Sequence, residues 1–354
     1  MKAIIIGYPL SGKTTFFDAI SGQITTDTQK NSVNIRNIKV IDERLEYLRN
    51  IYKPKKYTPA EINVIDNYIS VSDYLKDNTI FTRSTLENIN KSEVIIILIR
   101  AFSNNESPYF KDKVEPFLDL KNLVEEMCFL DLMTAEKRIE RLKKENKKNL
   151  EFNAINKAFE HLQNNKPVYQ LNFSEDEINA LSGFKFITQN KIMVLINSDD
   201  TNDFSQDIAK IEEYCRTLDL TAVRLNAKIE FEISQFSDEI EKLEFLKEYG
   251  LSEPISNRFV RNVYKMMNLI SFFTVGQDEV KAWTIKKNTS ALKAAGKIHS
   301  DIERGFIRAE IMHYPDFFAV SGNIQNLKAA GKLHLEGKEY IVNDGDIINF
   351  RFNV

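Results

Sequence analysis

Nearly continuous apolar runs in the first two thirds of the chain predict strands that are buried on both faces. The runs span residues 3–6, 61–65, 94–99 and 192–196, and they are rich in Ile and Val. Strands of this kind occur in parallel sheets that are covered by helices on both faces. The intervening segments are long enough for crossover helices, so the pattern predicts a doubly wound, mainly parallel α/β domain.

A different pattern starts near residue 119 and predicts a helical hairpin inserted in this domain. Apolar residues recur at helical spacing from Leu120 to Leu142 and again from Phe152 to Leu162, on either side of a polar stretch. The predicted end of the hairpin, residues 137–148, carries seven Lys or Arg residues against two Glu residues. A solvated helix end is the simpler interpretation, and a local anion-binding surface suited to RNA is the functional one.

The last part of the chain, from about Gly276, changes to short alternating strands and turns. Strands are predicted at residues 280–285, 306–313, 339–342 and 347–352, with a turn at 343–346 and a short helix at 290–295. This pattern predicts a small mixed module at the C-terminus.

Composition narrows the class of protein further. With 354 residues the chain is expected to form two or three domains, and its net charge of −3 gives no global attraction to nucleic acid or to an anionic membrane. Cys128 and Cys215 form no C-x-x-C pair, which argues against a disulfide framework or a thiolate metal site. No apolar run is long enough to span a bilayer. We therefore expect a cytoplasmic protein without a membrane partner or sequence-specific reading of DNA.

The strongest chemical signal is a phosphate-binding loop after the first predicted strand. Residues 7–14 match G-x-x-x-x-G-K-[ST] at every fixed position, and a helical pattern follows them. Gly7 and Gly12 let the backbone turn so that its N–H groups surround phosphates, to which Lys13 adds a positive charge. Thr14 offers a hydroxyl to Mg²⁺. The residues expected to bind the nucleotide here are Gly7, Pro9, Leu10, Ser11, Gly12, Lys13, Thr14 and Thr15.

A second predicted strand ends at Asp66, where such folds place a carboxylate that helps to hold Mg²⁺. The alternative is a turn-forming residue at a strand end. GTPases continue this motif as D-x-x-G, because the Gly amide contacts the γ-phosphate and moves on hydrolysis. Here Ile69 occupies the Gly position, and a β-branched residue lacks that backbone freedom. The sequence therefore predicts an altered switch.

Candidate base-binding residues follow two later strands. Asn197 and Asp200 keep the spacing of the guanine motif N-K-x-D, but Ser198 replaces the Lys, so guanine selectivity is not assured. A polar turn after a strand is the alternative. A second candidate segment, which could approach the base through backbone amides, consists of Asn226, Ala227 and Lys228.

At these positions the chain resembles the YchF/Obg-like ATPase family. Residues 7–15 are similar to the family's G-x-P-N-V-G-K-S-T, with Leu10 and Ser11 in place of Asn and Val. Residues 197–200 are similar to its N-x-x-E motif. Residues 294–310 resemble A-A-G-x-I-H-x-D-x-E-x-G-F-I-R-A-E, and residues 272–284 resemble F-T-A-G…E-V-R-A-W-T. The likeness covers essentially the whole chain.

The resemblance implies three parts. They are a P-loop nucleotide-binding (G) domain at residues 1–118 and 188–275, an inserted helical coiled coil at 119–187, and a ubiquitin-like (β-grasp) TGS domain at 276–354. It also implies Mg²⁺ with ATP or GTP as bound nucleotide, slow hydrolysis, and a ribosome or RNA as partner.

Departures from the family leave three hypotheses open. The segment from Thr25 to Val33 is short and offers no clear Thr to close on Mg²⁺, the D-x-x-G glycine is lost, and no His precedes His161. The first hypothesis is a slow ATPase or GTPase that uses Lys13, Thr14 and Asp66. The second is a protein that binds nucleotide without hydrolysing it, and the third is an RNA- or ribosome-binding protein with a vestigial loop. A P-loop kinase is less compatible with the C-terminal resemblance.

Overall fold

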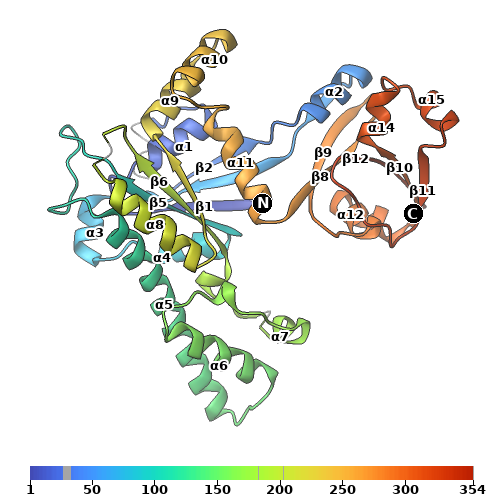
Figure 1. Ribbon diagram of the computed structural model, residues 1–354. Helices are drawn as coiled ribbons and strands as arrows, with labels where there is room; N and C mark the ends of the chain where they lie inside the picture. The colour runs from blue at the N-terminus through green and yellow to red at the C-terminus, as the bar shows by residue number, and fades with distance from the viewer. Residues whose placement is uncertain (27–32, 182, 202, 354) are drawn as a thin grey trace. The chain divides into compact units, whose positions relative to one another are not determined.

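The chain forms two compact units, each built around one sheet (Figure 1). The computed structural model describes residues 1–26, 33–181, 183–201 and 203–353. The first unit comprises Met1–Ile38 and Asn63–Ser256, and the second comprises Lys39–Ile62 and Asn257–Val354.

The sheet of the first unit has the strand order β2-β4-β1-β5-β6-β7, and its strands run parallel from β4 to β7. The predicted strands at 3–6, 61–65, 94–99 and 192–196 correspond to β1, β4, β5 and β6, which confirms the prediction of a doubly wound parallel sheet. The strands span Lys2–Ile6 (β1), Asn34–Lys39 (β2), Glu61–Asp66 (β4), Val94–Ala101 (β5), Lys191–Ser198 (β6) and Thr221–Leu225 (β7).

Helices cover both faces of this sheet because alternate strand residues point to opposite faces. Ile95 and Ile97 of β5 belong to a core that includes Leu123 of α5 and Ile211 of α8. Figure 1 shows α4, α5 and α8 on this face and α1 and α9 on the other. These helices span Lys13–Ser21 (α1), Arg83–Asn90 (α4), Pro116–Lys144 (α5), Ser205–Thr217 (α8) and Ala227–Gln235 (α9), while α3 spans Val71–Asp77 and α10 spans Glu239–Glu248.

The predicted helical hairpin is present as α5 and α6 (Leu150–Leu162), which pack against each other. Ile139 and Leu142 on α5 are buried in the same core as Ile155 on α6. The side chain of Asn149 accepts a hydrogen bond from Phe152 N at 3.1 Å and so begins α6 directly after the turn. The chain then passes through the 3₁₀ turn Val168–Gln170 (η1) and α7 (Glu175–Ala180).

A buried carboxylate on α5 fixes the segment that leads into β6. Asp131 is 2% exposed, and it accepts hydrogen bonds from the backbone nitrogens of Ile187 and Thr188 at 2.7 and 2.8 Å. It also accepts one from the Thr188 hydroxyl at 2.6 Å. These residues form the 3₁₀ turn η2 (Ile187–Gln189) immediately before β6, whose far end carries Asn197.

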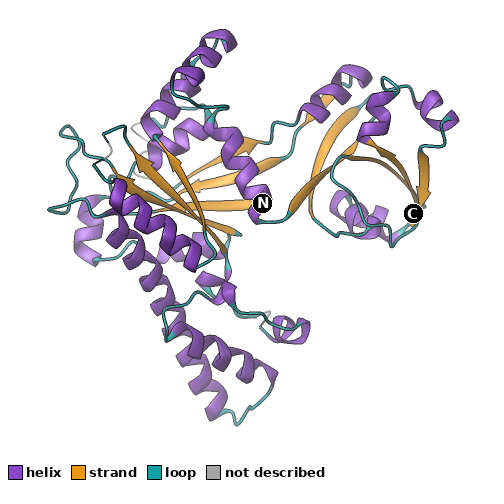
Figure 2. Ribbon diagram, in the orientation of Figure 1, coloured by secondary structure: helices purple, strands orange, loops and turns teal. Residues whose placement is uncertain are grey.

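The second unit contains a mixed sheet with the strand order β11-β10-β12-β8-β9-β3 (Figure 2). β8 pairs with β9 in antiparallel and with β12 in parallel orientation, as expected of a β-grasp module. Helix α12 (Ala291–Ile298) packs on the sheet through three buried alanines, Ala291, Ala294 and Ala295. The strands span Lys56–Thr58 (β3), Leu269–Thr274 (β8), Glu279–Lys286 (β9), Phe306–His313 (β10), Leu333–Glu336 (β11) and Asp346–Phe352 (β12).

The prediction of a strand at residues 339–342 was wrong. Only an isolated bridge from Ile341 to Ser290 forms there. The buried Asp346 explains the difference, because it accepts hydrogen bonds from Asn343 N and the Tyr340 hydroxyl, both at 2.9 Å. These bonds hold the segment in a turn, whereas β11, which the sequence pattern missed, pairs with β10.

Residues from the first third of the chain complete the second sheet, which the sequence did not predict. β3 pairs with β9, and α2 (Glu43–Tyr52) packs in the same unit. Tyr52 stacks on Phe317 with ring centroids 6.2 Å apart. The remaining helices span Ile255–Met266 (α11), Ser300–Arg304 (α13), Tyr314–Ala319 (α14) and Ile324–Ala329 (α15).

Replacing Asp131 tests how much the turn η2, which precedes β6, depends on this one carboxylate. Asp131→Ala should lower the free energy of unfolding by about 3 kcal/mol, because it leaves buried backbone donors without partners. Urea denaturation measures this change. Glu140→Ala, which removes an exposed carboxylate from the same helix, should stay within about 0.5 kcal/mol of the unchanged protein. Equal effects of the two substitutions would contradict the anchoring role.

Candidate functional site

The candidate site lies at the carboxyl edge of the parallel sheet. β1 ends at Ile6, residues 7–12 form the loop, and α1 begins at Lys13. β1 lies between β4 and β5. The chain leaves β1 towards the side of β2 and β4, and it later crosses from β4 to β5 on the other side of β1. Ligands of open α/β sheets bind at such a switch point, beyond the carboxyl ends of the strands.

The loop carbonyls are engaged by side chains. Lys13 Nζ donates to Gly7 O and Tyr8 O, both at 2.9 Å. Arg100 Nη1 donates to Leu10 O at 2.8 Å, and Asn197 Nδ2 donates to Ser11 O at 3.0 Å. The carbonyl and the N–H of a trans peptide point in opposite directions, so three of these contacts also set the direction of an N–H group, at Tyr8, Ser11 and Gly12. Pro9, which follows Tyr8, has no N–H. Amides directed in this way can form an anion-binding concavity.

Two glycines of the motif are required by close contacts. A Cβ on Gly7 would lie 2.4 Å from Leu98 O, and a Cβ on Gly12 would lie 2.4 Å from Asn197 Nδ2. Gly12 also has a left-handed backbone with φ 95°, which other residues rarely adopt. The glycines therefore allow β5 and β6 to approach the loop closely.

Lys13 and Asp66 are a pair of buried ionisable groups next to the loop, and the charge of each affects the pKa of the other. Burial lowers the pKa of the Lys13 ammonium to about 8, although the charge of Asp66 opposes this shift. Burial raises the pKa of Asp66, which Lys13 and the hydrogen bond from Thr14 oppose. In both groups desolvation outweighs the pairing, so each gains from a further partner of opposite charge.

Thr14 and Asp66 together fit a magnesium ion. Thr14 Oγ1 donates to Asp66 Oδ2 at 3.2 Å, while Asp66 Oδ1 is buried without a hydrogen-bond partner in the described part of the chain. Mg²⁺ takes oxygen ligands and commonly binds through one or two protein groups together with phosphates and water. Accordingly, the absence of any cluster of three His, Cys, Asp or Glu side chains among the described residues does not count against it.

A cavity of about 770 Å³ opens beside the loop. Of the predicted site residues, nine line it: Leu10, Gly12, Lys13, Thr14, Thr15, Asn197, Asn226, Ala227 and Lys228. Gly7, Pro9 and Ser11 belong to the loop but are not part of the lining, and Asp66 lies behind Thr14. Tyr8 packs instead against Tyr74, with ring centroids 5.4 Å apart. The cavity is large enough for a small organic ligand next to the phosphate loop.

Asn197 joins the loop to the base-binding candidates. Its Oδ1 accepts a hydrogen bond from Ala227 N at 2.9 Å, while its Nδ2 holds Ser11 O. Asn226 uses its own side chain to cap α9. Asp200 is exposed and does not line the cavity, whereas its neighbour Asp199 does.

Sequence reasoning did not assign a site role to Arg100 or to residues 102–107, which form one wall of the cavity. Arg100 is the penultimate residue of β5, which is otherwise apolar, and it is only 2% exposed. Its guanidinium stacks on Phe102, 4.1 Å from the ring centroid. A charged residue inside an apolar strand run was the available signal.

The segment after Asp66 is anchored to the body of the first unit. Asn67 is buried and donates to Thr85 Oγ1 at 2.9 Å. Ile69 is 7% exposed, belongs to the core and also lines the cavity, and Ser70 caps α3. An apolar residue packed in this way restrains the backbone where GTPases have a mobile glycine.

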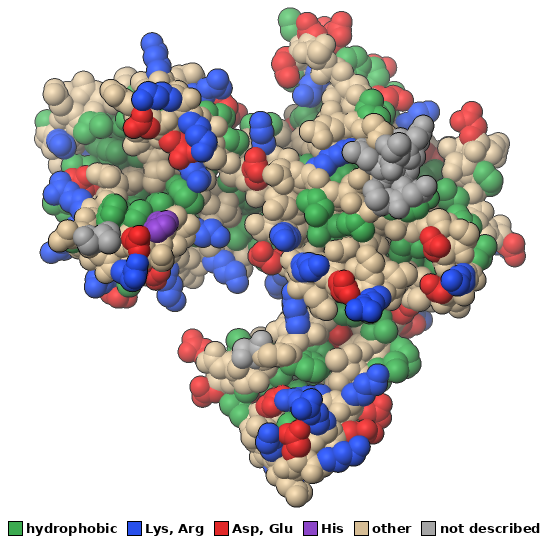
Figure 3. All heavy atoms as spheres, turned by 180° about the vertical axis from the view of Figure 1, so that it is seen from behind, with side chains coloured by type: hydrophobic (Ala, Val, Ile, Leu, Met, Phe, Trp, Pro, Cys, Tyr) green, Lys and Arg blue, Asp and Glu red, His purple; other side chains and the backbone are tan. Residues whose placement is uncertain are grey.

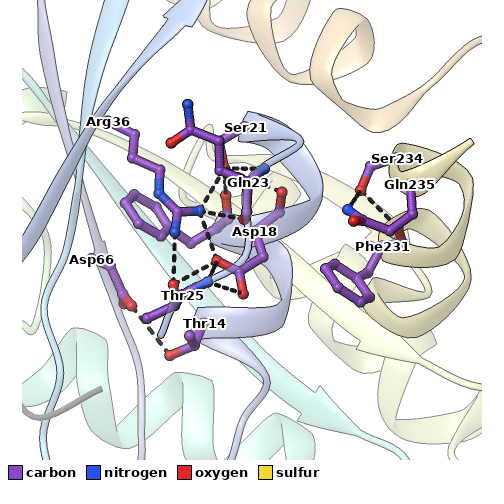
Figure 4. A network of polar contacts seen from close by, with 11 residues as sticks. Thr14, Asp18, Ser21, Gln23, Thr25, Arg36, Asp66, Phe231, Ser234 and Gln235 are labelled. Atoms are coloured by element: carbon purple, nitrogen blue, oxygen red, sulfur yellow. Dashed lines mark hydrogen bonds and ion pairs between the residues drawn. The ribbon is translucent and has the colours of Figure 1, made fainter. Parts of the chain in front are cut away.

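A polar network connects Thr25 and Arg36 to Asp18 on α1 (Figure 4). Arg36 Nη1 lies 2.7 Å from Asp18 Oδ1, and the Thr25 hydroxyl donates to the same oxygen at 2.6 Å. Thr25 is therefore engaged with Asp18, and it does not line the cavity. The short segment in which no magnesium-binding Thr could be identified includes residues 27–32, which lie outside the described residues.

The parallel sheet, the loop and the charged pair define a P-loop nucleotide-binding protein. Comparison with known proteins then gives the family. The chain is 35% identical over 367 residues to "Ribosome-binding ATPase YchF" of Bacillus subtilis, covering all of both chains. It is 34% identical over 363 residues to the protein of the same name from Escherichia coli O157:H7, covering all of this chain and 99% of the relative. The chain therefore belongs to the YchF family.

Two further comparisons agree with this assignment. The family model YchF-GTPase_C, described as a protein of unknown function (DUF933), matches residues 269–353. The solved structure of the Schizosaccharomyces pombe YchF GTPase superposes with a TM-score of 0.83 at 28% identity, covering 99% of this chain and 97% of that one. None of the described helices has the length and apolar character needed to cross a membrane.

Gly12→Ala tests whether the loop depends on the close approach of Asn197. The substitution should lower the free energy of unfolding by about 3 kcal/mol, since it combines backbone strain with loss of the Asn197 contact. Gly250→Ala is a matched control, because Gly250 has φ 65° and an added Cβ would meet no described atom within 4 Å. It should lose only about 1 kcal/mol. Thermal and urea denaturation of both variants measure these losses. Equal losses of stability in Gly12→Ala and Gly250→Ala would contradict the prediction.

Proposed function

We propose that this protein binds ATP or GTP with Mg²⁺, hydrolyses it slowly, and uses the bound nucleotide to control association with the ribosome. The observation that supports this most directly is the loop whose carbonyls are held by Lys13, Arg100 and Asn197 beside a buried carboxylate. The relatives supply the expected partner, since they are named ribosome-binding ATPases.

Each site residue has a role in this proposal. The loop amides and Lys13 hold the β- and γ-phosphates, while Thr14 and Asp66 hold Mg²⁺. When bound, the metal neutralises the charge that develops on the phosphates. Asn197 orients the loop towards the base side of the cavity, where Asp199, Asp200 and the backbone of residues 226–228 are candidates for base contacts.

Slow hydrolysis follows from the anchored segment after Asp66. Positioning and electrostatic stabilisation supply most of the catalysis in phosphoryl transfer, so a loop with Lys13 supports a basal rate. The packing of the buried Ile69 restrains a backbone amide that is mobile in many GTPases. Among the described residues, none is identified as a base for the attacking water. A protein that binds nucleotide without any turnover is the second candidate, favoured by the same Ile69 packing.

The α5–α6 hairpin is the proposed ribosomal contact. Its end shows Lys and Arg side chains mixed with acidic ones (Figure 3). Arg138 pairs with Glu151, and Arg141 pairs with Glu145. Lys143 and Lys144 are exposed, and they could bind RNA phosphates through salt-sensitive contacts.

The same proposal covers organisation and location. It assigns residues 1–118 and 188–275 to the G domain, 119–187 to the inserted coiled coil and 276–354 to a TGS domain. Residues 39–62 and 257–275 nevertheless pack in the second compact unit. A ribosome-associated role implies the cytoplasm as its compartment.

Titration calorimetry with ATP, ADP, GTP and GDP in the presence of Mg²⁺, followed by phosphate release from the tightest triphosphate, tests the proposal. The unchanged protein should bind at least one pair and release phosphate on the order of 10⁻³ per second or slower. Lys13→Ala should weaken binding by about 10- to 100-fold. Asp66→Asn should weaken binding of the magnesium complex more than that of the metal-free nucleotide, whereas Asp77→Asn, at an exposed carboxylate, should change neither.

The outcomes separate the alternatives. Tight binding without turnover, even with ribosomes present, would favour the non-hydrolysing protein. Equal background release from the unchanged protein and Lys13→Ala would remove the claim of enzymatic activity. An absence of nucleotide affinity together with RNA binding would indicate a vestigial loop.

Proton uptake on nucleotide binding follows from the pKa of Lys13. With a pKa of about 8 in the free protein, the amine loses its proton as the pH rises through 8, whereas a bound phosphate favours the ammonium. Binding should therefore weaken above pH 8 and take up about half a proton at pH 8. Calorimetry in buffers of different ionisation enthalpy measures this uptake. Lys13→Arg is the control, because Arg stays charged throughout this pH range. Any proton uptake that it shows comes from the nucleotide itself and is subtracted from the value for the unchanged protein.

Neutralising the hairpin end tests the ribosomal contact. Lys143→Gln with Lys144→Gln should weaken ribosome binding several-fold and reduce its salt dependence, while nucleotide affinity stays unchanged. Co-sedimentation over a range of salt concentrations measures the effect. Lys210→Gln with Lys247→Gln removes two exposed lysines elsewhere in the first unit and serves as the control. Equal loss in both double variants would argue against a local contact.

A further inference from the structure

Leu10 has a backbone conformation that is unfavourable for its residue type. Its φ is 62°, in the left-handed region. The other described non-glycine residues with positive φ are all polar: Lys53, Asn78, Asn146, Asn165, Asp219, Asn268, Asn288 and Ser321. Asn and Asp tolerate this region better because a short polar side chain can bond locally. Leu10 has no such help, so its surroundings must hold it there.

Arg100 supplies the contact that holds Leu10. Its Nη1 donates to Leu10 O at 2.8 Å, across 90 positions of sequence. The guanidinium is itself fixed, since Nε donates to Phe102 O at 3.2 Å and Nη2 donates to Ser107 O at 2.9 Å. Within the described residues, all three of these acceptors are backbone carbonyls. A planar, multidentate group suits this position, and Lys could not reproduce it.

The direction of the Leu10 carbonyl determines the direction of an amide in the loop. The carbonyl of Leu10 and the N–H of Ser11 belong to one planar trans peptide, so they point in opposite directions. Because Arg100 fixes the Leu10 carbonyl, it also fixes the direction of the Ser11 N–H. Asn197 does the same for the next peptide by holding Ser11 O.

We propose that Arg100 is a positioning residue of the phosphate-binding loop, which keeps Leu10 in the left-handed conformation and thereby aims the Ser11 amide at the bound phosphates. The inference rests on the proposed nucleotide binding. There are two alternatives. Arg100 also lines the cavity, so its charge could attract the phosphates directly. It could also stabilise the fold without affecting binding.

A double-mutant cycle on the full chain separates these roles. The four proteins are the unchanged chain, Arg100→Met, Leu10→Gly and the double variant, each titrated with Mg²⁺ and ADP. Arg100→Met should weaken binding about 30-fold, and the affinity measured for Leu10→Gly is the reference for the second half of the cycle. Since Gly adopts a left-handed backbone without help, the double variant should lie within about fivefold of Leu10→Gly. Leu10→Asn should rescue Arg100→Met in part, because Asn tolerates this region.

Arg100→Lys distinguishes positioning from charge. It keeps the charge but loses the multidentate geometry, so the proposal predicts a loss close to that of Arg100→Met, again relieved by Leu10→Gly. Near-normal binding by Arg100→Lys, or an unchanged 30-fold loss in the Leu10→Gly background, would overturn the proposal in favour of direct electrostatics. A lower melting temperature with unchanged affinity would show a structural role only.

The remaining outcomes are also informative. Should Arg100→Met fail to fold, the same cycle with Arg100→Lys carries the test. Failure of the unchanged protein to bind any nucleotide refutes the proposed function itself, whereas binding with an additive cycle refutes only the role of Arg100.

Discussion

Phosphate binding by this fold depends on keeping several backbone amides unpaired and directed at one point. Such an arrangement conflicts with the tendency of buried backbone groups to pair with each other. The structure resolves this conflict from outside the loop, because the carbonyls of Gly7, Tyr8, Leu10 and Ser11 are each engaged by a side chain. Two of those side chains, Arg100 and Asn197, come from the ends of β5 and β6, so the loop is only as well defined as its sheet.

The sheet and the loop could be predicted from sequence because their signals are local. Ile95, Ile96 and Ile97 identify a strand buried on both faces without knowledge of its neighbours. The loop is a contiguous motif between a strand and a helix. The contact from Asn197 to Ser11 spans 186 positions, and spacing alone identified Asn197 as a base-binding candidate rather than as a support of the loop.

Other features depended on tertiary context that no local pattern contains. Arg100 was overlooked because its partners are backbone carbonyls, which leave no mark on residue type. Residues 339–342 alternate like a strand, yet the buried Asp346 draws Tyr340 and Asn343 into a turn. The pairing of Lys56–Thr58 with β9 joins segments more than 200 positions apart, and the short β3 has no distinctive composition.

That pairing affects the order in which the protein can mature during synthesis. β3 leaves the ribosome long before β9, so Tyr57 and its neighbours wait without their sheet while more than two hundred residues are added. Contacts of such large sequence separation form slowly because a long loop must close first. The second unit therefore acquires its edge late, after the nucleotide-binding sheet is already complete in the nascent chain. A shortened chain that lacks the C-terminal third would leave β3 without the strand it pairs with.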